Sequence, residues 1–436
     1  MKIRQSSVPC TVEPMSVPFA YKMSEIGIIP KDWDLIKLGQ IAEIRNGSTP
    51  NTQVSKFWNG TIPWCTPTDI TATKGKYLEA TKKYITKIGL SSCSANLLPP
   101  GTLLLCSRAT IGELKITKTN ICTNQGFKSL VCKSDVLNEF LYYLILFLKP
   151  KFIERANGST FLEISKQDLA NILIQLPGLD EQHAIAEALS DVDRLIEALD
   201  KLIIKKRNVK RATMQQLLTG KTRLPGFEGD WISLNIGKQS LLKARIGWQG
   251  LTTEEYLRTG NYYLVTGTDF INGEISWETC DFVTKHRYDQ DKYIQLSLGD
   301  ILLTKDGTIG KSAYINKLPF PATLNSGVFV IRPLDNAYNP KYLFYLLMSQ
   351  VFMHFLNKLQ AGSTITHLYQ KDFIGFDFLA PPTLEEQTAV VTILSELDAE
   401  IKALEFRLDK TKQIKQGMMQ QLLTGRVRLI KREAAD

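Results

Sequence analysis

The sequence contains the same 46-residue segment twice, and this repeat restricts the fold more than any other feature. Residues 179–224 align without a gap with residues 384–429, at an offset of 205 and with 21 of 46 positions identical. The run MQQLLTG occurs near the end of both copies. Chance does not place such a run twice at a constant offset, so the repeat indicates a duplication, and we expect both copies to fold alike.

Both copies have the apolar spacing of a long helix. In each copy, successive apolar residues are separated by 4, 3, 4, 3 and 4 positions, which is the spacing of a coiled-coil seam. These residues are Ile185, Leu189, Val192, Ile196, Leu199 and Ile203 in the first copy and Val390, Leu394, Leu397, Ile401, Leu404 and Leu408 in the second. Proline precedes each copy, and Gly220 and Gly425 follow as C-terminal caps. We expect the two seams to pack on each other; the alternative is that each helix is buried in its own domain.

Short islands of sequence also repeat in front of each helix. Thr-x-Thr-Asp at 66–69 returns at 266–269, and Thr-Ile-Gly at 110–112 returns at 308–310. The residues between the islands differ, which predicts two related globular units that are each followed by a helix. The expected boundaries are an N-terminal extension (1–24), a first globular unit (25–176), a central helical region (177–226), a second globular unit (227–380) and a C-terminal helical region (381–430).

The pattern inside each globular unit is mixed. Residues 102–106, 301–304 and 328–331 are short apolar runs bounded by turn residues, as strands are. Residues 140–147 and 342–348 are rich in leucine and aromatic residues and lack turn signals, which favours core helices over base-stacking surfaces. We therefore expect an α/β (mixed α+β) class for both units, without the regular alternation of a doubly wound sheet.

The charge distribution points to a polyanionic partner. Of the net charge of +9, the stretch 201–223 alone carries eight basic residues and no acidic one. A solvated helix face is the alternative explanation of that stretch. The longest apolar run, residues 140–148, is far shorter than the roughly 20 residues of a membrane span. Seven cysteines without a CxxC pattern are typical of reduced thiols, so we expect a cytoplasmic protein that does not bind membranes.

The sequence contains few motifs that could indicate catalysis. The sequence Gly-Lys-Ser at 310–312 ends like a phosphate-binding loop, but Lys305 stands where the leading glycine is required. The four histidines have no metal-ligand spacing to each other or to the cysteines. Neither Pro-Pro pair has the flanking residues of an adenine methyltransferase. We therefore expect no catalytic residues, no metal and no cofactor.

The layout resembles the specificity (S) subunit of type I restriction–modification enzymes, over nearly the whole chain. The resemblance is carried by IPKDWDLIKLG near the start, Gly-Ser-Thr late in each unit, Leu-Pro or Pro-Pro leading to Glu-Gln, and MQQLLTG at the end of each helix. It implies a subunit without enzymatic activity of its own. Two target-recognition domains would each read half of a bipartite, asymmetric site in double-stranded DNA.

The same resemblance implies the partners. The two helical regions would pair as an antiparallel coiled coil in a pseudo-twofold arrangement and dock two methyltransferase (M) subunits, through which restriction (R) subunits join. The helix residues that we assign to partner binding on this basis are Gln182, Gln216, Leu217, Gln387, Gln421 and Leu422.

Candidate DNA contacts come from loops flanked by glycine, where the backbone can approach a phosphate. They are Arg45, Arg108, Thr110, Ser159 and Thr160 in the first unit and Arg245, Lys305, Thr308, Ser363 and Thr364 in the second. A turn or capping role is the alternative for each of them.

Two other functions are compatible with the pattern. One is a fused enzyme with its own methyltransferase, which the missing motifs disfavour. The other is a protein-binding scaffold that uses the coiled coil as a spacer and does not bind DNA. Equally weak binding to every duplex in the presence of the partner would favour the scaffold.

Overall fold

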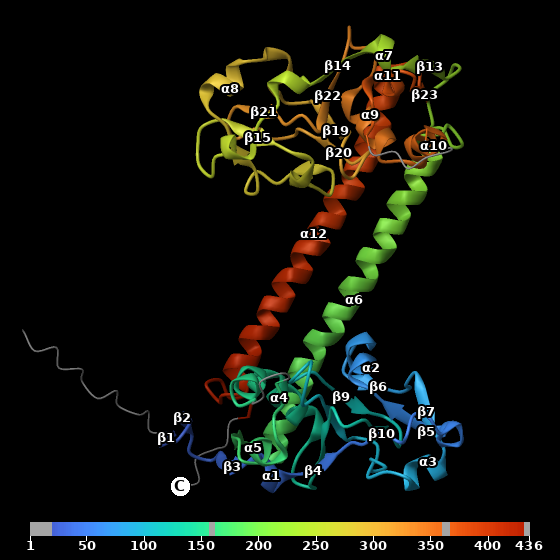
Figure 1. The fold of residues 1–436 in the computed structure, drawn as a ribbon. Coiled ribbons are helices and arrows are strands. Elements are labelled where there is room, and N and C mark those ends of the chain that lie inside the picture. Colours follow the sequence, from blue (N-terminus) through green and yellow to red (C-terminus); the bar gives the residue numbers. More distant parts are fainter. Residues whose placement is uncertain (1–19, 157–161, 360–366, 431–436) are drawn as a thin grey trace, which may run out of the picture. The chain divides into compact units, whose positions relative to one another are not determined.

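A computed structural model describes residues 20–156, 162–359 and 367–430 of the chain. The chain divides into two compact units, the first of which is built from two separate stretches of the sequence (Figure 1). Unit 1 consists of residues 1–200 and 406–436, and unit 2 consists of residues 201–405. Both boundaries fall inside long helices, so each unit contains the beginning of one long helix and the end of the other.

The strands of unit 1 form four sheets with the orders β4-β11-β8-β9-β6, β10-β5-β7, β12-β3 and β1-β2. The strands are β1 (Tyr21–Ser24), β2 (Gly27–Pro30), β3 (Asp34–Lys37), β4 (Ala42–Asn46), β5 (Trp58–Cys65), β6 (Tyr77–Leu78), β7 (Lys83–Ile85), β8 (Leu103–Leu105), β9 (Leu114–Thr117), β10 (Cys122–Thr123), β11 (Lys128–Cys132) and β12 (Leu173–Leu176). Strand β1 covers the last residues of the predicted N-terminal extension.

The helices of unit 1 cover these sheets. They are α1 (Leu38–Ile41), α2 (Pro67–Ala72), α3 (Lys87–Ser91), α4 (Asn138–Glu154), α5 (Lys166–Ala170) and the first part of α6 (Leu179–Leu217). The first turns of α4 are buried almost all round, from Phe140 to Ile145, in the same core cluster as the central strands. The aromatic residues of 140–147 therefore belong to the core, as the sequence predicted.

Unit 2 repeats this topology. Its sheets have the orders β14-β22-β19-β20, β18-β15-β21, β13-β23 and β16-β17. The strands are β13 (Ile232–Asn235), β14 (Ser240–Ala244), β15 (Tyr263–Val265), β16 (Phe270–Ile271), β17 (Glu274–Ile275), β18 (Asp281–Phe282), β19 (Ile301–Thr304), β20 (Ser312–Tyr314), β21 (Ala322–Leu324), β22 (Val328–Pro333) and β23 (Asp377–Ala380). The helices are α7 (Ile236–Gln239), α8 (Lys285–Asp289), α9 (Pro340–Leu347), α10 (Gln350–Leu359), α11 (Gln370–Phe373) and the first part of α12 (Leu384–Leu422).

The large sheets of the two units share four strands in the same order, and the three-stranded sheets also correspond. The order β4-β11-β8-β9 in unit 1 matches β14-β22-β19-β20 in unit 2, and both three-stranded sheets contain one parallel and one antiparallel pair. The main difference is that β6 extends the large sheet of unit 1, whereas β16 and β17 form a separate hairpin in unit 2. The mixed α/β class and the tandem arrangement predicted from the sequence are confirmed.

The long helices α6 and α12 begin and end at equivalent positions of the repeat, Leu179 to Leu217 and Leu384 to Leu422. Gly220 and Gly425 follow with φ angles of 69° and 68°, a conformation that glycine adopts without strain. None of the twelve apolar residues of the predicted seams is exposed. The burial therefore follows the spacing of 4 and 3 residues that the sequence shows.

Candidate nucleic-acid interface

Each unit carries a tight loop between two neighbouring strands of its large sheet, which we call the tip loop. In unit 1 it spans residues 106–112, between β8 and β9, and the Gly112 amide donates to the Cys106 carbonyl over 3.1 Å. In unit 2 it spans residues 304–310, between β19 and β20, and the Gly310 amide donates to the Thr304 carbonyl over 3.0 Å. The two tip loops therefore close in the same way.

A second loop supports each tip loop, and we call it the amide loop (residues 124–126 and 325–327). In unit 1 the Ser107 amide donates to the Gly126 carbonyl at 2.8 Å, and the Gly126 amide donates to Oδ1 of Asn124 at 2.9 Å.

In unit 2 the Lys305 amide donates to the Gly327 carbonyl at 2.9 Å, and the Gly327 amide donates to Oδ1 of Asn325 at 2.8 Å. The backbone is thus the same in both units. The Asn-x-Gly pattern, repeated at a separation of 201 residues, is the sequence signal for these loops, which were not among the predicted contact sites.

The side chains on this common backbone differ. At equivalent bridge positions unit 1 pairs Arg108 with Glu163, and unit 2 pairs Asp306 with His367. Within the amide loop, unit 1 exposes Gln125. Polar side chains on a rigid loop scaffold are suited to contact base edges.

Four of the predicted contacts lie on the tip loops, two in each unit. Arg108 is half-buried and Thr308 is exposed. The hydroxyl of the half-buried Thr110 is itself buried, without a hydrogen-bond partner among the described residues, which disfavours its predicted contact with DNA. Lys305 is half-buried on the tip loop of unit 2, with its ammonium 5.4 Å from the centre of the Phe329 ring. Each tip loop therefore contains two of the contacts that were predicted from glycine-flanked loops.

Arg45 lies on β4, at a distance in sequence from the tip loop. Its guanidinium forms an ion pair with Glu43 at 2.6 Å and donates to Oδ1 of Asn96 at 3.3 Å. The side chain is 43% exposed and can still meet a phosphate, although Glu43 offsets its charge. A DNA contact by Arg45 stays a prediction.

The structure places Arg245 in the interior of unit 2. It is 2% exposed, and its Nε donates to the Leu324 carbonyl at 2.8 Å while a terminal nitrogen donates to Thr323 Oγ1 at 3.2 Å. Burial, together with the nearby Arg287, lowers the pKa of this guanidinium. Arg245 thus holds β14 and β21 together, and this burial disfavours the predicted contact with DNA.

Four predicted contacts lie outside the described residues. They are the serine and threonine of each Gly-Ser-Thr sequence, Ser159, Thr160, Ser363 and Thr364.

Two of the predicted partner-binding residues are internal instead. Gln182 and Gln387 are each 1% exposed. The side-chain oxygen of Gln182 accepts the Leu137 amide at 2.8 Å, and that of Gln387 accepts the Asn339 amide at 2.7 Å. Both glutamines therefore fasten the first turn of a long helix to the segment in front of α4 or α9, which leaves little of either side chain for a partner protein.

Of the other four predicted partner residues, two are exposed and two are buried. Gln216 and Gln421 are exposed. Leu217 is 6% exposed in a core cluster of unit 2, and Leu422 is 4% exposed in a core cluster of unit 1. The repeated run MQQLLTG therefore owes its leucines to packing, whereas its second glutamine faces solvent in both copies.

Half of the basic stretch 201–223 is neutralised within unit 2. Four of its eight basic residues form ion pairs with carboxylates of α12, in the pairs Lys206–Glu400, Arg207–Glu405, Lys210–Asp398 and Arg223–Glu386. The remaining four are exposed, namely Lys201, Lys205, Arg211 and Lys221. The positive surface available to a polyanion is thus smaller than the sequence indicated.

A bidentate ion pair, which we call a clasp, closes each unit. In unit 1, Arg428 binds both oxygens of Glu181 at 2.7 Å and those of Asp32 at 2.7–2.9 Å. The hydrogen bonds to Glu181 and Asp32 raise the pKa of the Arg428 guanidinium. In unit 2, Arg223 binds Glu386 at 2.7 and 2.9 Å in the same way.

A second repeated contact, which we call a joint, connects three helices within each unit. In unit 1 the Tyr143 hydroxyl, on α4, donates to Asp193 of α6 at 2.7 Å, and Lys415 of α12 forms an ion pair with the same carboxylate at 2.6 Å. Lys415 also lies 5.4 Å from the centre of the Tyr143 ring. Burial raises the pKa of Tyr143, so its hydroxyl remains a donor.

The joint of unit 2 is built from Tyr345 of α9, Asp398 of α12 and Lys210 of α6. The hydroxyl donates to the carboxylate at 2.8 Å, and the ammonium lies 5.5 Å from the ring centre. The aspartates and lysines of the joints, like the arginines and glutamates of the clasps, are identical at the offset of 205. That identity is the signal by which sequence reasoning could have found them.

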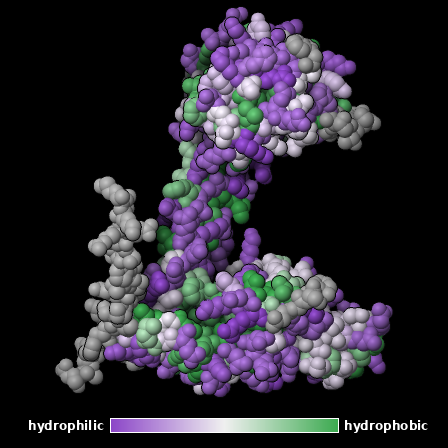
Figure 2. All heavy atoms as spheres, turned by 60° about the vertical axis from the view of Figure 1, so that its left-hand side comes forward, coloured by the Kyte–Doolittle hydropathy of each residue, from purple (hydrophilic) through white to green (hydrophobic). Residues whose placement is uncertain are grey.

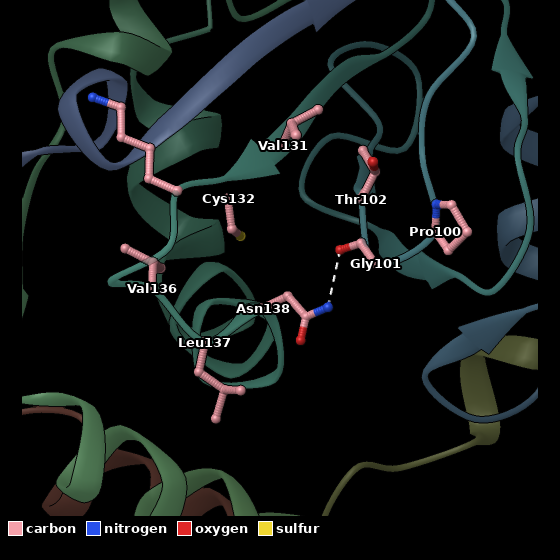
Figure 3. A pocket seen from close by; sticks show the side chains of 9 residues that line it. Pro100, Gly101, Thr102, Val131, Cys132, Val136, Leu137 and Asn138 are labelled. Atoms are coloured by element: carbon pink, nitrogen blue, oxygen red, sulfur yellow. Dashed lines mark hydrogen bonds between the residues drawn. The ribbon is translucent and has the colours of Figure 1, made fainter.

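A cavity of about 230 Å³ lies beside the start of α4 in unit 1 (Figure 3). Asn138 spans its wall by donating to the Gly101 carbonyl at 3.1 Å, and Cys132 also lines it. Burial raises the pKa of the Cys132 thiol to about 12, so this cysteine is no thiolate nucleophile. The cavity is below the size of typical ligand sites.

Neither metal ligands nor membrane spans emerge from the described part of the chain. Residues 20–156, 162–359 and 367–430 contain no group of three or more His, Cys, Asp or Glu side chains that could hold a metal ion. Among the same residues no helix is both long and apolar enough to cross a membrane.

Several similar proteins are named specificity subunits of type I restriction enzymes. The specificity subunit of the type I restriction enzyme MjaIX from Methanocaldococcus jannaschii is 29% identical over 384 residues, which are 83% of this chain and 86% of the relative. The MjaVIII specificity subunit from the same organism is 25% identical over 422 residues, 92% of this chain and 94% of the relative. In Escherichia coli, the EcoR124I/EcoR124II specificity subunit is 26% identical over 169 residues, 37% of this chain and 41% of the relative.

Solved structures share the fold. The S subunit of a type I restriction-modification system from M. genitalium aligns with a TM-score of 0.55 at 17% identity, over 89% of this chain and 96% of that one. A chain from a study of complex assembly and conformational transition of the type I R-M system aligns with a TM-score of 0.59 at 18% identity, over 92% of this chain and 99% of that one.

The model of one protein family covers most of the sequence. Its description is "Type I restriction modification DNA specificity domain", and it matches twice, at residues 30–206 and at residues 250–415. The two matches coincide with the two tip-loop scaffolds and with parts of both long helices. The chain therefore belongs to the family of type I restriction modification DNA specificity domains.

Proposed function

We propose that this chain is the DNA sequence-recognition subunit of a type I restriction–modification complex. It reads a bipartite, asymmetric site in double-stranded DNA, has no catalytic activity of its own, and works in the cytoplasm. The observation that carries this proposal is the repeated loop scaffold, whose backbone is the same in both units and whose exposed side chains differ. A pair of such readers is suited to two unlike half-sites.

The division of labour follows the predicted regions. Residues 25–176 and 227–380 are the two target-recognition domains, and residues 177–226 and 381–430 form an antiparallel coiled coil that serves as spacer. Ion pairs within unit 2 support the pairing, because the partners of Lys206 and Lys210 are Glu400 and Asp398, in reversed order along α12. In unit 1, Lys415 of α12 pairs with Asp193 of α6.

Contacts with the duplex divide into two kinds. Arg45 and Lys305 would contact phosphates, which gives salt-dependent affinity without sequence preference. Arg108 and Thr308 lie on the tip loops and are the candidates for contacts with base edges, whereas the hydroxyl of Thr110 is buried.

The partners are two methyltransferase (M) subunits, with restriction (R) subunits joining through them. The near-identical ends of the long helices offer the same surface twice, which suits one kind of partner bound at two places. Exposed apolar side chains on the helices, Ile204, Val209, Phe406 and Ile414, add contact area for such partners. Figure 2 shows hydrophobic residues among hydrophilic ones along the surface of the helices.

An exchange experiment tests this function. Residues 25–176 are replaced by the equivalent region of a family member with a different target, and the hybrid is expressed with the methyltransferase subunit of this system. Sequencing of methylated DNA should show one half of the recognised site changed and the other half retained, because each domain reads by itself. Changes in both halves, or a hybrid with the unaltered site, would contradict the proposal.

A further inference from the structure

The two tip loops carry opposite charges at the same place on the same backbone. Arg108 and Asp306 both stand two residues after the end of the preceding sheet pairing, and each is bridged to the strand-like segment that follows the Gly-Ser-Thr region. The carbonyl of the residue before each one accepts an amide of that segment, Ile164 to Ser107 at 2.9 Å and Leu368 to Lys305 at 2.8 Å. Side chains at these two positions therefore leave the scaffold in equivalent directions.

In unit 1 the surrounding charges leave Arg108 available. Its bridge partner Glu163 is taken by Lys128, whose ammonium lies 2.9 Å from the carboxylate and is largely buried. Within the described residues the Arg108 guanidinium has no hydrogen-bond or ion-pair partner of its own. Its Nε lies 3.5 Å from the point where a Cβ on Gly126 would stand, so the glycine makes room for it over the amide loop.

In unit 2 the same three positions hold different residues. Phe329 replaces the lysine and lies under Lys305, and His367 replaces the glutamate and contacts Asp306 through Nδ1. That contact uses Oδ1 of Asp306, which leaves Oδ2 to accept another hydrogen bond. The side chain of Asp306 is 44% exposed. Its Cβ lies 3.5 Å from the point where a Cβ on Gly327 would stand, so a glycine makes room for this side chain too.

We propose that Arg108 and Asp306 are the residues that make the two half-sites different. Arg108 reads a guanine in one half-site, because its two parallel N–H groups match O6 and N7 in the major groove. Asp306 reads a cytosine in the other half-site, because a carboxylate accepts from the N4 amino group. This inference rests on the proposed function, and it assigns the base preference of each unit to one side chain on a shared backbone.

The test uses the full chain bound to the methyltransferase subunit of its own system. Complexes of the original chain, Arg108→Ala and Asp306→Ala select duplexes from a randomised library, and the enriched sequences are read. Arg108→Ala should lose preference for one guanine by roughly 10- to 100-fold and leave the other half-site intact. Asp306→Ala should lose preference for one cytosine, in the other half-site alone.

Two further variants separate reading from folding and from general charge. Arg108→Lys should keep much of the guanine preference, since lysine also donates to guanine O6 and N7. Arg258→Ala removes an arginine that is 91% exposed and should leave every base preference unchanged. Thermal unfolding of each variant confirms that the unit remains folded.

The outcomes distinguish failure of the proposed function from failure of this inference. An original chain that enriches no sequence at all contradicts the proposed function. An original chain that enriches a bipartite site while Arg108→Ala and Asp306→Ala enrich the same site at every position overturns this inference and leaves the function standing. A variant that alters both halves also overturns it.

Discussion

At the scale of single residues, the repeat allows each side chain to be compared with its counterpart in the same molecule. Gly220 and Gly425 have the same left-handed backbone, yet their surroundings differ. A Cβ on Gly425 would collide with the ring of Pro30 and approach Trp33 at 3.3 Å, whereas the atoms nearest to a Cβ on Gly220 belong to Trp231 and lie 3.4 Å away, at ordinary contact distance. The same cap therefore tolerates a side chain differently in the two units.

This difference predicts unequal effects of the same substitution. Gly220→Ala should lower the free energy of unfolding of unit 2 by about 1–2 kcal/mol, the cost of a left-handed alanine. Gly425→Ala should lower that of unit 1 by about 2–5 kcal/mol, since overpacking against Pro30 adds about 1–3 kcal/mol to the cost of a left-handed alanine. Urea unfolding of both variants measures the difference, and equal losses would show that the Pro30 contact relaxes without cost.

At the scale of elements, each long helix contributes residues to both compact units. In unit 1 the joint connects α6 and α12 to α4, and in unit 2 an equivalent joint connects them to α9. The sequence predicted the seams and the caps, because the spacing of apolar residues and the position of glycine are local properties. It did not predict the joints, since Tyr143, Asp193 and Lys415 come from three segments that only the folded unit brings together.

The spacer role of the helices can be tested by shortening them. Deleting residues 201–204 and 404–407 removes about 6 Å from each helix at 1.5 Å per residue. The unspecified gap between the half-sites should then shorten by one or two base pairs, because base pairs repeat about every 3.4 Å. Sequencing of methylated DNA gives the gap length.

A matched control keeps the helix length. Replacing the same eight residues by alanine removes their side chains without moving the two ends of either helix. The gap should then be unchanged. An unaltered gap in the deletion variant as well would mean that the helices do not set the spacing.

At the scale of the whole molecule, the division into units does not follow the order of the chain. Unit 1 takes its core leucines Leu422 and Leu423 and its clasp residue Arg428 from the last part of the sequence. Unit 2 consists of one continuous stretch, residues 201–405. Each unit is thus completed by the end of a helix that begins in the other.

Removing the last part of the chain should therefore damage the first unit. In a variant that ends at Glu405, hydrogen exchange should become faster in the peptides of residues 20–200, because their core loses Leu422 and Leu423. Peptides of residues 201–405 serve as the internal control and should keep their protection. Unchanged exchange in both groups would show that residues 406–430 contribute no stability to unit 1.

The sequence supplied the fold class, the tandem order and the helices, and it supplied only part of the site. The glycine-flanked loops that the sequence predicted as contact sites include both tip loops, where Arg108, Thr110, Lys305 and Thr308 lie. The sequence could not show that Arg108 is accessible and Arg245 is buried, since both arginines lie near glycines in predicted loops. Only the tertiary packing of unit 2 buries Arg245. For the same reason the repeated Gln182 and Gln387 looked like a partner surface, whereas they are internal hydrogen-bond acceptors.

Because unit 1 is built from two separate stretches of the sequence, its folding during translation depends on residues that are synthesised last. When residue 405 has been added, every part of unit 2 has been synthesised, while the unit encoded first still lacks a piece of its core. Unit 1 must therefore wait, partly open, through the synthesis of the whole second half of the polypeptide. We expect the earlier-made unit to be the later one to reach its native state, and chaperone binding during translation to concentrate on it.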